Sequence, residues 1–239
     1  MFKCCSLYSG SSGNSFLIKT ENTCVLIDSG VSSKKIVSAL EDNSIDPGKI
    51  DGIFITHEHI DHTRSVGLLS SKYNIPIYAN KETWKELLMQ NSKLKELNIN
   101  YFVNDKKFIF QDLEILPFST PHDAVNPCGF SICKNGKKVS IATDLGHISN
   151  KVIKNLESSN LVMLEANYDQ DVLKYSRYPY SLKQRIQSPI GHLENSSSGK
   201  AISHLIKLGL QNALLIHLSK ENNFTELAYK TLVEELNKD

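Results

Sequence analysis

The sequence predicts an α/β fold in one large domain, and three observations support this expectation. Short apolar runs typical of strands alternate with segments of helical spacing in the first and last thirds of the chain. The length of 239 residues exceeds the usual domain size of ~100–150 residues, but single α/β domains run to ~250. The composition, with 40% hydrophobic and 22% charged residues, is that of an ordinary globular protein. Because no repeat or low-complexity linker interrupts the chain, we expect one domain over residues 1–239.

The expected elements follow the hydrophobic pattern along the chain. In the first third, the pattern predicts strands at 15–18, 24–27 and 52–56 and helices at 32–40 and 66–73. In the middle, it predicts strands at 75–78, 108–110, 113–116, 129–132 and 139–142 and a helix at 81–97. Asn135-Gly136 is typical of the turn in a β-hairpin. The last third alternates again, with strands at 161–164 and 213–218 and helices at 198–208 and 225–236.

A segment of weak periodicity at about 168–190 resembles an insertion. It interleaves basic residues, among them Arg177 and Lys183, with several tyrosines. Such a mixture can bind phosphates and stack bases, as in proteins that bind single-stranded nucleic acid. The alternative is a solvated excursion of helix and loop. The pattern leaves both interpretations open.

The charge balance excludes a strong global field. The 27 lysines and arginines almost cancel the 26 aspartates and glutamates, so any nucleic-acid site must be a local patch. No apolar run has the length of a signal peptide core or a membrane span, and we therefore expect a cytoplasmic protein with no membrane partner. In that reducing compartment, we interpret the five scattered cysteines as small buried hydrophobic residues.

Four candidate metal ligands lie within six residues of one another, directly after the apolar strand expected at 52–56. They are His57, His59, Asp61 and His62. This density is unusual for ordinary packing, because each buried imidazole or carboxylate needs a partner. Imidazole binds zinc, manganese and iron, and a carboxylate can bind the metal or accept a proton from metal-bound water. The cluster therefore predicts a metal site at a strand-to-helix turn.

This His-x-His-x-Asp-His motif, preceded by a strand and Thr56, resembles the signature of the metallo-β-lactamase superfamily. The resemblance implies a four-layer αββα sandwich and a hydrolase with two divalent metal ions. It further implies that three later residues join the ligand set, namely His122, Asp144 as the bridging carboxylate, and His217. The first ion would then be held by His57, His59 and His122, and the second by Asp61, His62 and His217. Zinc or manganese is expected, and iron also suits these ligands.

Other residues have expected roles around the metals. Asp28 falls where the superfamily keeps an acidic residue that orients a liganding histidine, although a simple turn role is the alternative. Glu165 and His192 resemble the acid and histidine pair of the nuclease branches, which can protonate a leaving oxygen; a plain salt bridge is the alternative. His147 and His204 match no ligand motif, and a structural or surface role is expected for them. Candidate substrate contacts come from a small-residue loop and a helix start, Ser12, Asn14 and Ser196.

Several motifs together resemble one group within the superfamily, the bacterial YycJ/WalJ group. They are the small-residue loop at 9–15, the stretches at 143–147 and 191–193, and His-Leu-Ser-Lys-Glu-Asn-Asn at 217–223. This resemblance implies a 5′-to-3′ DNA exonuclease in which Asp61 helps to orient the attacking hydroxide. Ile60 and Glu194 depart from the expected pattern without removing a ligand. An RNA-processing nuclease and a thiolester or lactone hydrolase are the alternatives, and intact ligands argue against a non-catalytic scaffold.

Overall fold

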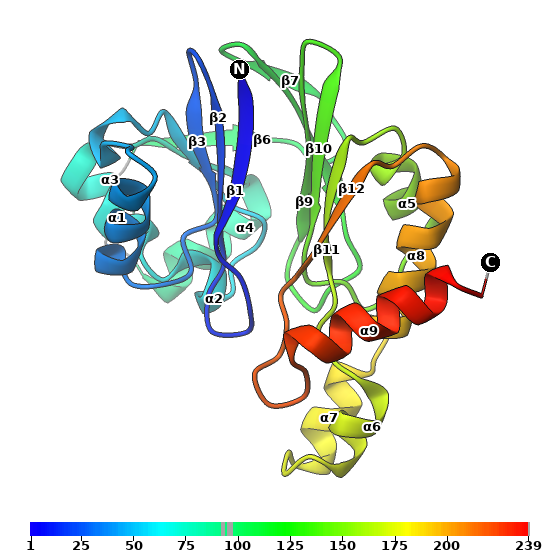
Figure 1. The fold of residues 1–239 in the computed structure, drawn as a ribbon. Helices are drawn as coiled ribbons and strands as arrows, with labels where there is room; N and C mark the ends of the chain where they lie inside the picture. The colour runs from blue at the N-terminus through cyan, green and yellow to red at the C-terminus, as the bar shows by residue number, and fades with distance from the viewer. Residues whose placement is uncertain (92–93, 95–97, 239) are drawn as a thin grey trace. The chain divides into compact units, whose positions relative to one another are not determined.

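The computed structural model describes residues 1–91, 94 and 98–238 (Figure 1). The chain divides into two compact units. Unit 1 comprises residues 1–117 and 124–128, and unit 2 comprises residues 118–123 and 129–239. Each unit contains a mixed sheet and helices, which agrees with the predicted α/β class. That the whole chain forms one hydrolase domain stays a prediction.

The sheet of unit 1 has the strand order β1-β2-β3-β4-β5-β6. Its first three strands are antiparallel and β3 to β6 are parallel. Leu26 of β3 lies opposite Ile53 of β4, which lies opposite Ile77 of β5. Parallel pairing brings the carboxyl ends of β3 and β4 to one edge of the sheet, where Asp28 and the histidine cluster follow. The strands are β1 Phe2–Tyr8, β2 Ser15–Thr20, β3 Cys24–Ile27, β4 Gly52–Phe54, β5 Ile77–Asn80 and β6 Ile99–Phe102.

Helices α1, α3 and α4 pack on one face of this sheet. Their apolar side chains, among them Ile36, Leu69 and Trp84, form one buried cluster with Leu26 and Ile53 of the strands. Burial of these side chains is the main force that holds the layers together. Unit 1 also contains a hairpin, β7 Phe108–Phe110 with the start of β8 Leu113–Ser119. The helices are α1 Ser33–Asp42, η1 Pro47–Lys49, α2 Ile60–Thr63, α3 Val66–Tyr73 and α4 Lys81–Gln90.

The strands of unit 2 follow the order β12-β11-β10-β9. β9 and β10 form the predicted hairpin, in which both Asn135 and Gly136 have positive φ. β10, β11 and β12 are parallel, so the residues that follow them gather at one edge of the sheet. Helices α5 and α8 pack against this sheet through Val152, Ile202 and Leu205. The elements are β9 Cys128–Lys134, β10 Lys137–Ala142, α5 Asn150–Leu156, β11 Leu161–Glu165, α8 Asn195–Lys207, β12 Asn212–Ile216 and α9 Thr225–Leu236.

The segment at 168–190 folds into two short helices, α6 Gln170–Tyr175 and α7 Tyr180–Ile186. They enclose a small core of Tyr168, Leu173 and Ile186. Asp169 caps α6, because its side chain accepts hydrogen bonds from the first turn. Helices of six and seven residues are too short to show a hydrophobic period, which explains the weak pattern in the sequence.

Some expectations differ from the structure. The helix predicted at 81–97 ends at Gln90, and the rest of that range, apart from residues 91 and 94, lies outside the described residues. The interpretation of all five cysteines as buried is wrong for three of them. Cys24 and Cys128 are buried, whereas Cys4, Cys5 and Cys133 are half-buried. Cys4 and Cys5 lie on β1, an edge strand that the sequence pattern missed, and edge strands are covered less than central ones.

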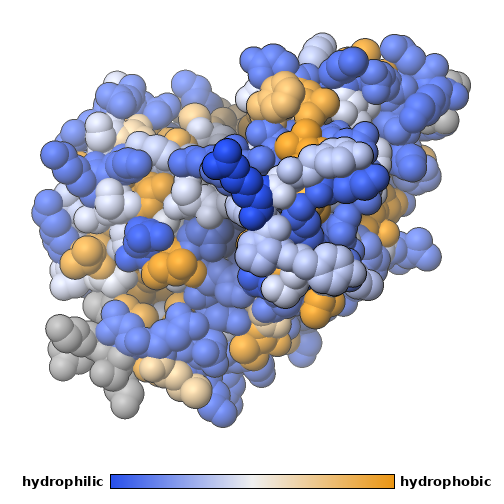
Figure 2. All heavy atoms as spheres, turned by 90° about the horizontal axis from the view of Figure 1, so that it is seen from below, coloured by the Kyte–Doolittle hydropathy of each residue, from blue (hydrophilic) through white to orange (hydrophobic). Residues whose placement is uncertain are grey.

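Among the described residues, no helix combines the length and the apolar character that a membrane crossing requires. Hydrophilic side chains dominate the face drawn in Figure 2, and the hydrophobic side chains on it form small, separate groups.

Candidate metal centre

In unit 1 the histidine cluster follows β4, and the short helix α2 carries its second half. His57 and His62 are buried, and the Asp61 side chain is 20% exposed. The Nε2 atom of His57 lies 3.1 Å from Nδ1 of His59, and Asp61 Oδ2 lies 3.4 Å from His62 Nε2. Unit 1 therefore brings together all four ligands that the motif predicts for it.

A carboxylate and a hydroxyl fix the orientation of two of these histidines. Asp28 is fully buried, and its Oδ2 accepts hydrogen bonds from His62 Nδ1 at 2.7 Å and from Thr56 Oγ1 at 2.8 Å. Thr56 Oγ1 in turn accepts from His57 Nδ1 at 2.9 Å. These partners assign the ring proton of both histidines to Nδ1. With the proton at Nδ1, each Nε2 is the nitrogen whose lone pair can accept, either from a metal ion or, in His62, from the Asn14 amide 3.1 Å away.

The donor set fits a divalent metal. Two ring nitrogens that face each other at 3.1 Å, as in His57 and His59, repel each other unless a proton or a cation satisfies both lone pairs. Imidazole nitrogens with a carboxylate beside them are the ligands that zinc, manganese and iron accept. Burial raises the pKa of Asp28, although the charge and hydrogen bond of His62 act in the opposite direction.

Replacement of Asp28 by asparagine is expected to weaken metal binding by about 10–100-fold. The amide NH₂ group cannot accept the proton of His62 Nδ1, so the ring loses the contact that holds it. Metal affinity is measured by competition with a chromogenic chelator, and Asp42→Asn, an exposed position on α1, is the matched control. An unchanged affinity in Asp28→Asn would show that Asp28 has only the turn role that the sequence left open.

The small-residue loop at 9–15 packs against the histidine cluster and contacts His62 and Asp61. Asn14 is fully buried, and its Nδ2 lies 3.2 Å from the Gly10 carbonyl oxygen and 3.1 Å from His62 Nε2. Its backbone N–H donates to the Asp61 carbonyl oxygen at 2.8 Å. The Asn14 side chain is thus used on the protein's own groups, which does not favour it as a substrate contact. Ser12 is exposed on the same loop and stays a candidate substrate contact.

Gly30 lies in the turn that follows β3, and the close approach of this turn to α2 requires a glycine there. A Cβ atom at Gly30 would overlap the backbone oxygen of Asp61. Gly30→Ala is expected to lower the free energy of unfolding by about 1–3 kcal/mol, because the extra methyl group forces backbone shifts in a packed region. Urea denaturation measures the change, with Gly48→Ala as the control, since a Cβ there meets only ordinary contacts. Equal stability of the two variants would contradict this packing account.

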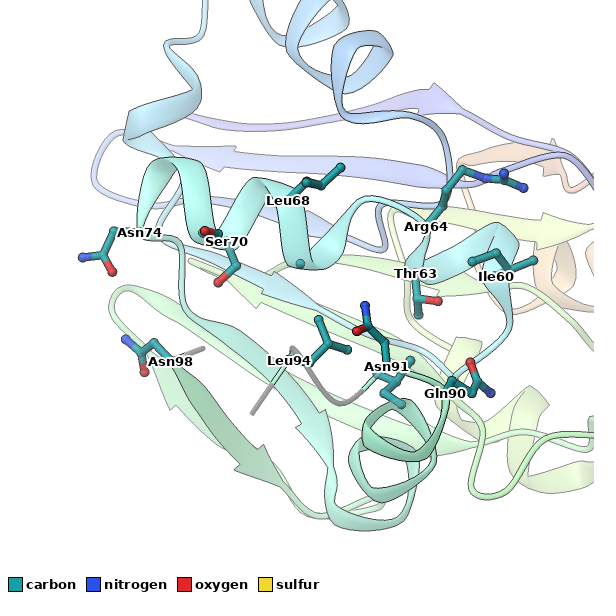
Figure 3. Close-up of a pocket in the computed structure, with 13 residues that line it drawn as sticks. Ile60, Thr63, Arg64, Leu68, Ser70, Asn74, Gln90, Asn91, Leu94 and Asn98 are labelled. Atoms are coloured by element: carbon teal, nitrogen blue, oxygen red, sulfur yellow. The ribbon is translucent and has the colours of Figure 1, made fainter. Parts of the chain in front are cut away.

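A pocket of about 910 Å³ lies in unit 1 beside α2 (Figure 3). Ile60 and Thr63 of α2 line it together with Arg64 and several amide side chains. Arg64 Nε donates to the Gly30 carbonyl oxygen at 3.3 Å. The lining includes none of the four candidate ligands of unit 1, so this pocket is separate from their donor atoms.

Unit 2 supplies the second set of donors. Asp144, Glu165, His192 and His217 each offer a ligand atom, and these atoms all lie within 4.8 Å of one another. His122 Nε2 lies 3.6 Å from Asp144 Oδ1. Asp144, Glu165 and His217 stand at or just after the ends of the parallel strands β10, β11 and β12, which explains why they meet.

Hydrogen bonds again turn the Nε2 atoms of two histidines toward ligation. His122 Nδ1 donates to the Gly191 carbonyl oxygen at 2.9 Å. His217 Nδ1 donates to Thr143 Oγ1 at 3.0 Å, and Thr143 donates to Asp144 Oδ2 at 2.7 Å. Thr143 thus repeats in unit 2 the part that Thr56 has in unit 1. The role of the two threonines, which link a histidine to a carboxylate, was not predicted from the sequence, although each directly precedes a candidate ligand after a strand.

Three of the candidate residues have a left-handed backbone. Asp28, Asp144 and His217 have φ values of 61°, 56° and 55°. This conformation is uncommon for residues other than glycine and costs of order 1 kcal/mol each. Each of these residues lies just beyond the carboxyl end of a strand, β3, β10 or β12, where the turn directs the side chain toward its neighbours. Such strain persists only where surrounding contacts maintain it, as at ligand-binding sites.

Glu165 and His192, which the family resemblance implied as a pair, lie in direct contact. His192 Nδ1 lies 2.8 Å from Glu165 Oε1, and Glu165 is fully buried. The other carboxylate oxygen of Glu165 accepts from the Leu145 and Leu193 backbone N–H groups at 2.6 and 3.3 Å. Burial lowers the pKa of His192, but Glu165, Asp144 and Asp123 outweigh it and raise the pKa to about 9. Because Nδ1 is held by Glu165, Nε2 remains as the atom that can act on a substrate.

The three remaining residues expected to contact substrate lie in unit 2 and differ in exposure and in their hydrogen-bond partners. Arg177 is exposed and stays a candidate. Lys183 donates to the carbonyl oxygens of Lys174 and Ser176 at 2.7 and 2.8 Å, so it closes the end of α6. Ser196 lies in the first turn of α8, where its hydroxyl donates to Glu194 Oε1. The structure therefore gives Lys183 and Ser196 internal partners, which does not favour them as substrate contacts.

Comparisons with known proteins identify the family of the chain. Residues 8–192 match the family described as the Metallo-beta-lactamase superfamily. The chain is 39% identical to Exodeoxyribonuclease WalJ of Streptococcus pneumoniae, over 98% of this chain and 88% of that protein. It is 34% identical to Exodeoxyribonuclease YycJ of Bacillus anthracis, over 93% and 84%. The crystal structure of the metallo-beta-lactamase fold protein YhfI from Bacillus subtilis is similar with a TM-score of 0.74 and 19% identity, over 99% and 92%.

Proposed function

Because the chain belongs to the metallo-β-lactamase superfamily, we propose that it is a metal-dependent hydrolase that acts as a 5′-to-3′ DNA exonuclease. The αββα sandwich of that superfamily is its fold. Relatives that match nearly the whole chain carry the name exodeoxyribonuclease, and this supports DNA as the substrate. The observation that carries the proposal is the contact between His192 and the buried Glu165, because hydrolysis of a phosphodiester needs a proton for the departing oxygen.

We assign the ligands as the family motif implies. His57, His59 and His122 would hold the first ion, Asp61, His62 and His217 would hold the second, and Asp144 would be the carboxylate shared by both. Thr56, Asp28, Gly191 and Thr143 contact Nδ1 of four of these histidines. These contacts support the assignment, because they make Nε2 the nitrogen that would ligate a metal. Divalent zinc or manganese suits the set, and iron is compatible with it.

When bound, two such ions supply a nucleophile at neutral pH and neutralise charge that develops on the phosphoryl oxygens. The protein's own groups do the rest. Asp61 helps to orient the attacking water. His192 donates the proton at Nε2 to the leaving oxygen, and Glu165 holds the ring in place through Nδ1. The exposed Ser12 and Arg177 contact the DNA strand, and the enzyme works in the cytoplasm on DNA ends.

The proposal is tested by assays of the purified protein with end-labelled DNA, end-labelled RNA, a thiolester and a lactone, each with zinc, manganese or magnesium. Cleavage of DNA with the highest kcat/KM supports the proposal. A preference for RNA would make the chain an RNA-processing nuclease. Activity confined to the thiolester or the lactone would exclude a nuclease function.

A further inference from the structure

Unit 2 contains a pocket of about 510 Å³ that adjoins His192 and that the proposed metal ligands do not explain. One wall is a single face of α8, because Ser197, Lys200, Ala201 and His204 recur at the spacing of adjacent helical turns. Lys200 and His204 are exposed, and the small Ala201 between them leaves room. A lysine and an imidazole therefore face the same space.

The opposite wall is a constrained loop that follows β10. His147 lies there, and its Nδ1 donates to the Pro189 carbonyl oxygen at 2.8 Å. Gly146 is required at this point, since a Cβ would overlap the backbone of Pro189. The Gly146 N–H donates to the Pro121 carbonyl oxygen at 2.8 Å. The loop is thus held from two sides, and His147 has a fixed place in the pocket wall.

The chemistry of the lining is that of a site for an anion with an apolar part. Lys200 contributes a positive charge, and His147, His192 and His204 contribute imidazole groups. Glu194 is the one carboxylate in the lining, and one of its oxygens already accepts from Ser196. Ile148, Ile153 and Leu193 supply apolar surface. The volume lies in the ~300–1,000 Å³ range of small-molecule sites.

We propose that this pocket binds one nucleotide, the one on the leaving side of the scissile phosphodiester, with Lys200 and His204 on its phosphate and the apolar residues against its base or sugar. The inference rests on the proposed function, because His192, the group that protonates the leaving oxygen, lies in the wall of the pocket. In that step the water oxygen bonds to phosphorus and loses a proton to solvent, the P–O ester bond breaks, and the leaving oxygen takes the proton of His192, which His192 later regains from solvent. A pocket that holds a single nucleotide favours removal of one nucleotide at a time from an end.

The test is calorimetric titration of the metal-loaded full chain with a deoxynucleoside monophosphate, inorganic phosphate and a deoxynucleoside. The double variant Lys200→Ala/His204→Ala is compared with Lys154→Ala, an exposed lysine on α5 that lies outside the pocket. We expect the double variant to bind the monophosphate at least about tenfold more weakly, as for the loss of charged hydrogen bonds. The control should bind like the wild type, and the KM for DNA should rise in the double variant with kcat nearly unchanged.

Monophosphate affinity in the double variant within twofold of the wild type would overturn the inference. So would equal affinity for the deoxynucleoside and the monophosphate, because the phosphate would then contribute nothing. If the wild type degrades DNA while either result holds, only the pocket assignment fails. If the wild type degrades no DNA at all, the proposed function fails, whatever the titrations show.

Discussion

Replacement of His192 by alanine is expected to lower the turnover of DNA by about 10²–10⁴-fold while the metal content stays near that of the wild type. The imidazole is the proposed proton donor, and it lies outside the seven residues assigned as ligands. Its Nδ1 is engaged by Glu165 at 2.8 Å, so the ring is oriented without a metal ion. Turnover is measured on end-labelled DNA, and metal content by atomic emission on the same preparation.

A second variant, Glu165→Gln, tests the partner of His192. It keeps the shape of the side chain but removes the negative charge that attracts the His192 proton. The DNA turnover of Glu165→Gln should lie between that of the wild type and that of His192→Ala, because the imidazole ring remains but is held less firmly. Loss of bound metal in His192→Ala would instead make His192 a ligand or a structural residue. The donor atoms of His192, Asp144 and His217 lie close enough together to share one metal ion. The metal content of His192→Ala therefore decides whether His192 is a ligand.

Replacement of Asp144 by asparagine is expected to remove at least one metal ion and to reduce turnover by more than the ~10–100-fold typical of changes around the ligands. Asp144 has imidazole nitrogens of His122, His192 and His217 at 3.6, 3.7 and 3.3 Å. If Asp144 is the carboxylate shared by two ions, as proposed, its replacement by a neutral amide would leave their charge without this balancing anion. Asparagine tolerates the left-handed backbone at this position, so the fold is expected to survive.

Circular dichroism and thermal unfolding check that the Asp144→Asn protein is folded before its metal content is measured. Asp171→Asn, an exposed acidic position on α6, serves as the matched control and should retain both metal ions. Two bound metal ions and nearly wild-type turnover in Asp144→Asn would refute the bridging assignment, while leaving the other ligands open to the same test.

The sequence predicted those parts of the site that are local in the chain. The cluster at 57–62 lies within one strand-to-helix turn, and the apolar runs before and after it predicted that turn. The distant residues Asp144 and His217 came from family resemblance, because parallel pairing of β10, β11 and β12 is a tertiary feature. The αββα fold was expected on the same resemblance.

The direction of side chains and their hydrogen-bond partners could not be predicted from the sequence. Asn14 and Lys183 were expected to meet substrate, yet the fold turns the first inward and gives the second two carbonyl partners. The left-handed backbone at His217 could not be predicted from the sequence either, since only tertiary contacts maintain this strained conformation. His147 and His204 gave no motif signal, because they share a pocket only once the loop after β10 packs beside α8.

The most direct test of the central claim uses one DNA oligonucleotide labelled in separate samples at its 5′ end or at its 3′ end. With the metal-loaded protein, the 5′ label should appear first in mononucleotides, while the 3′ label stays on progressively shorter strands. A chelator should stop both reactions, and added manganese or zinc should restore them. Loss of the 3′ label first, internal cuts, or an intact oligonucleotide under all of these conditions would contradict a 5′-to-3′ metal-dependent exonuclease.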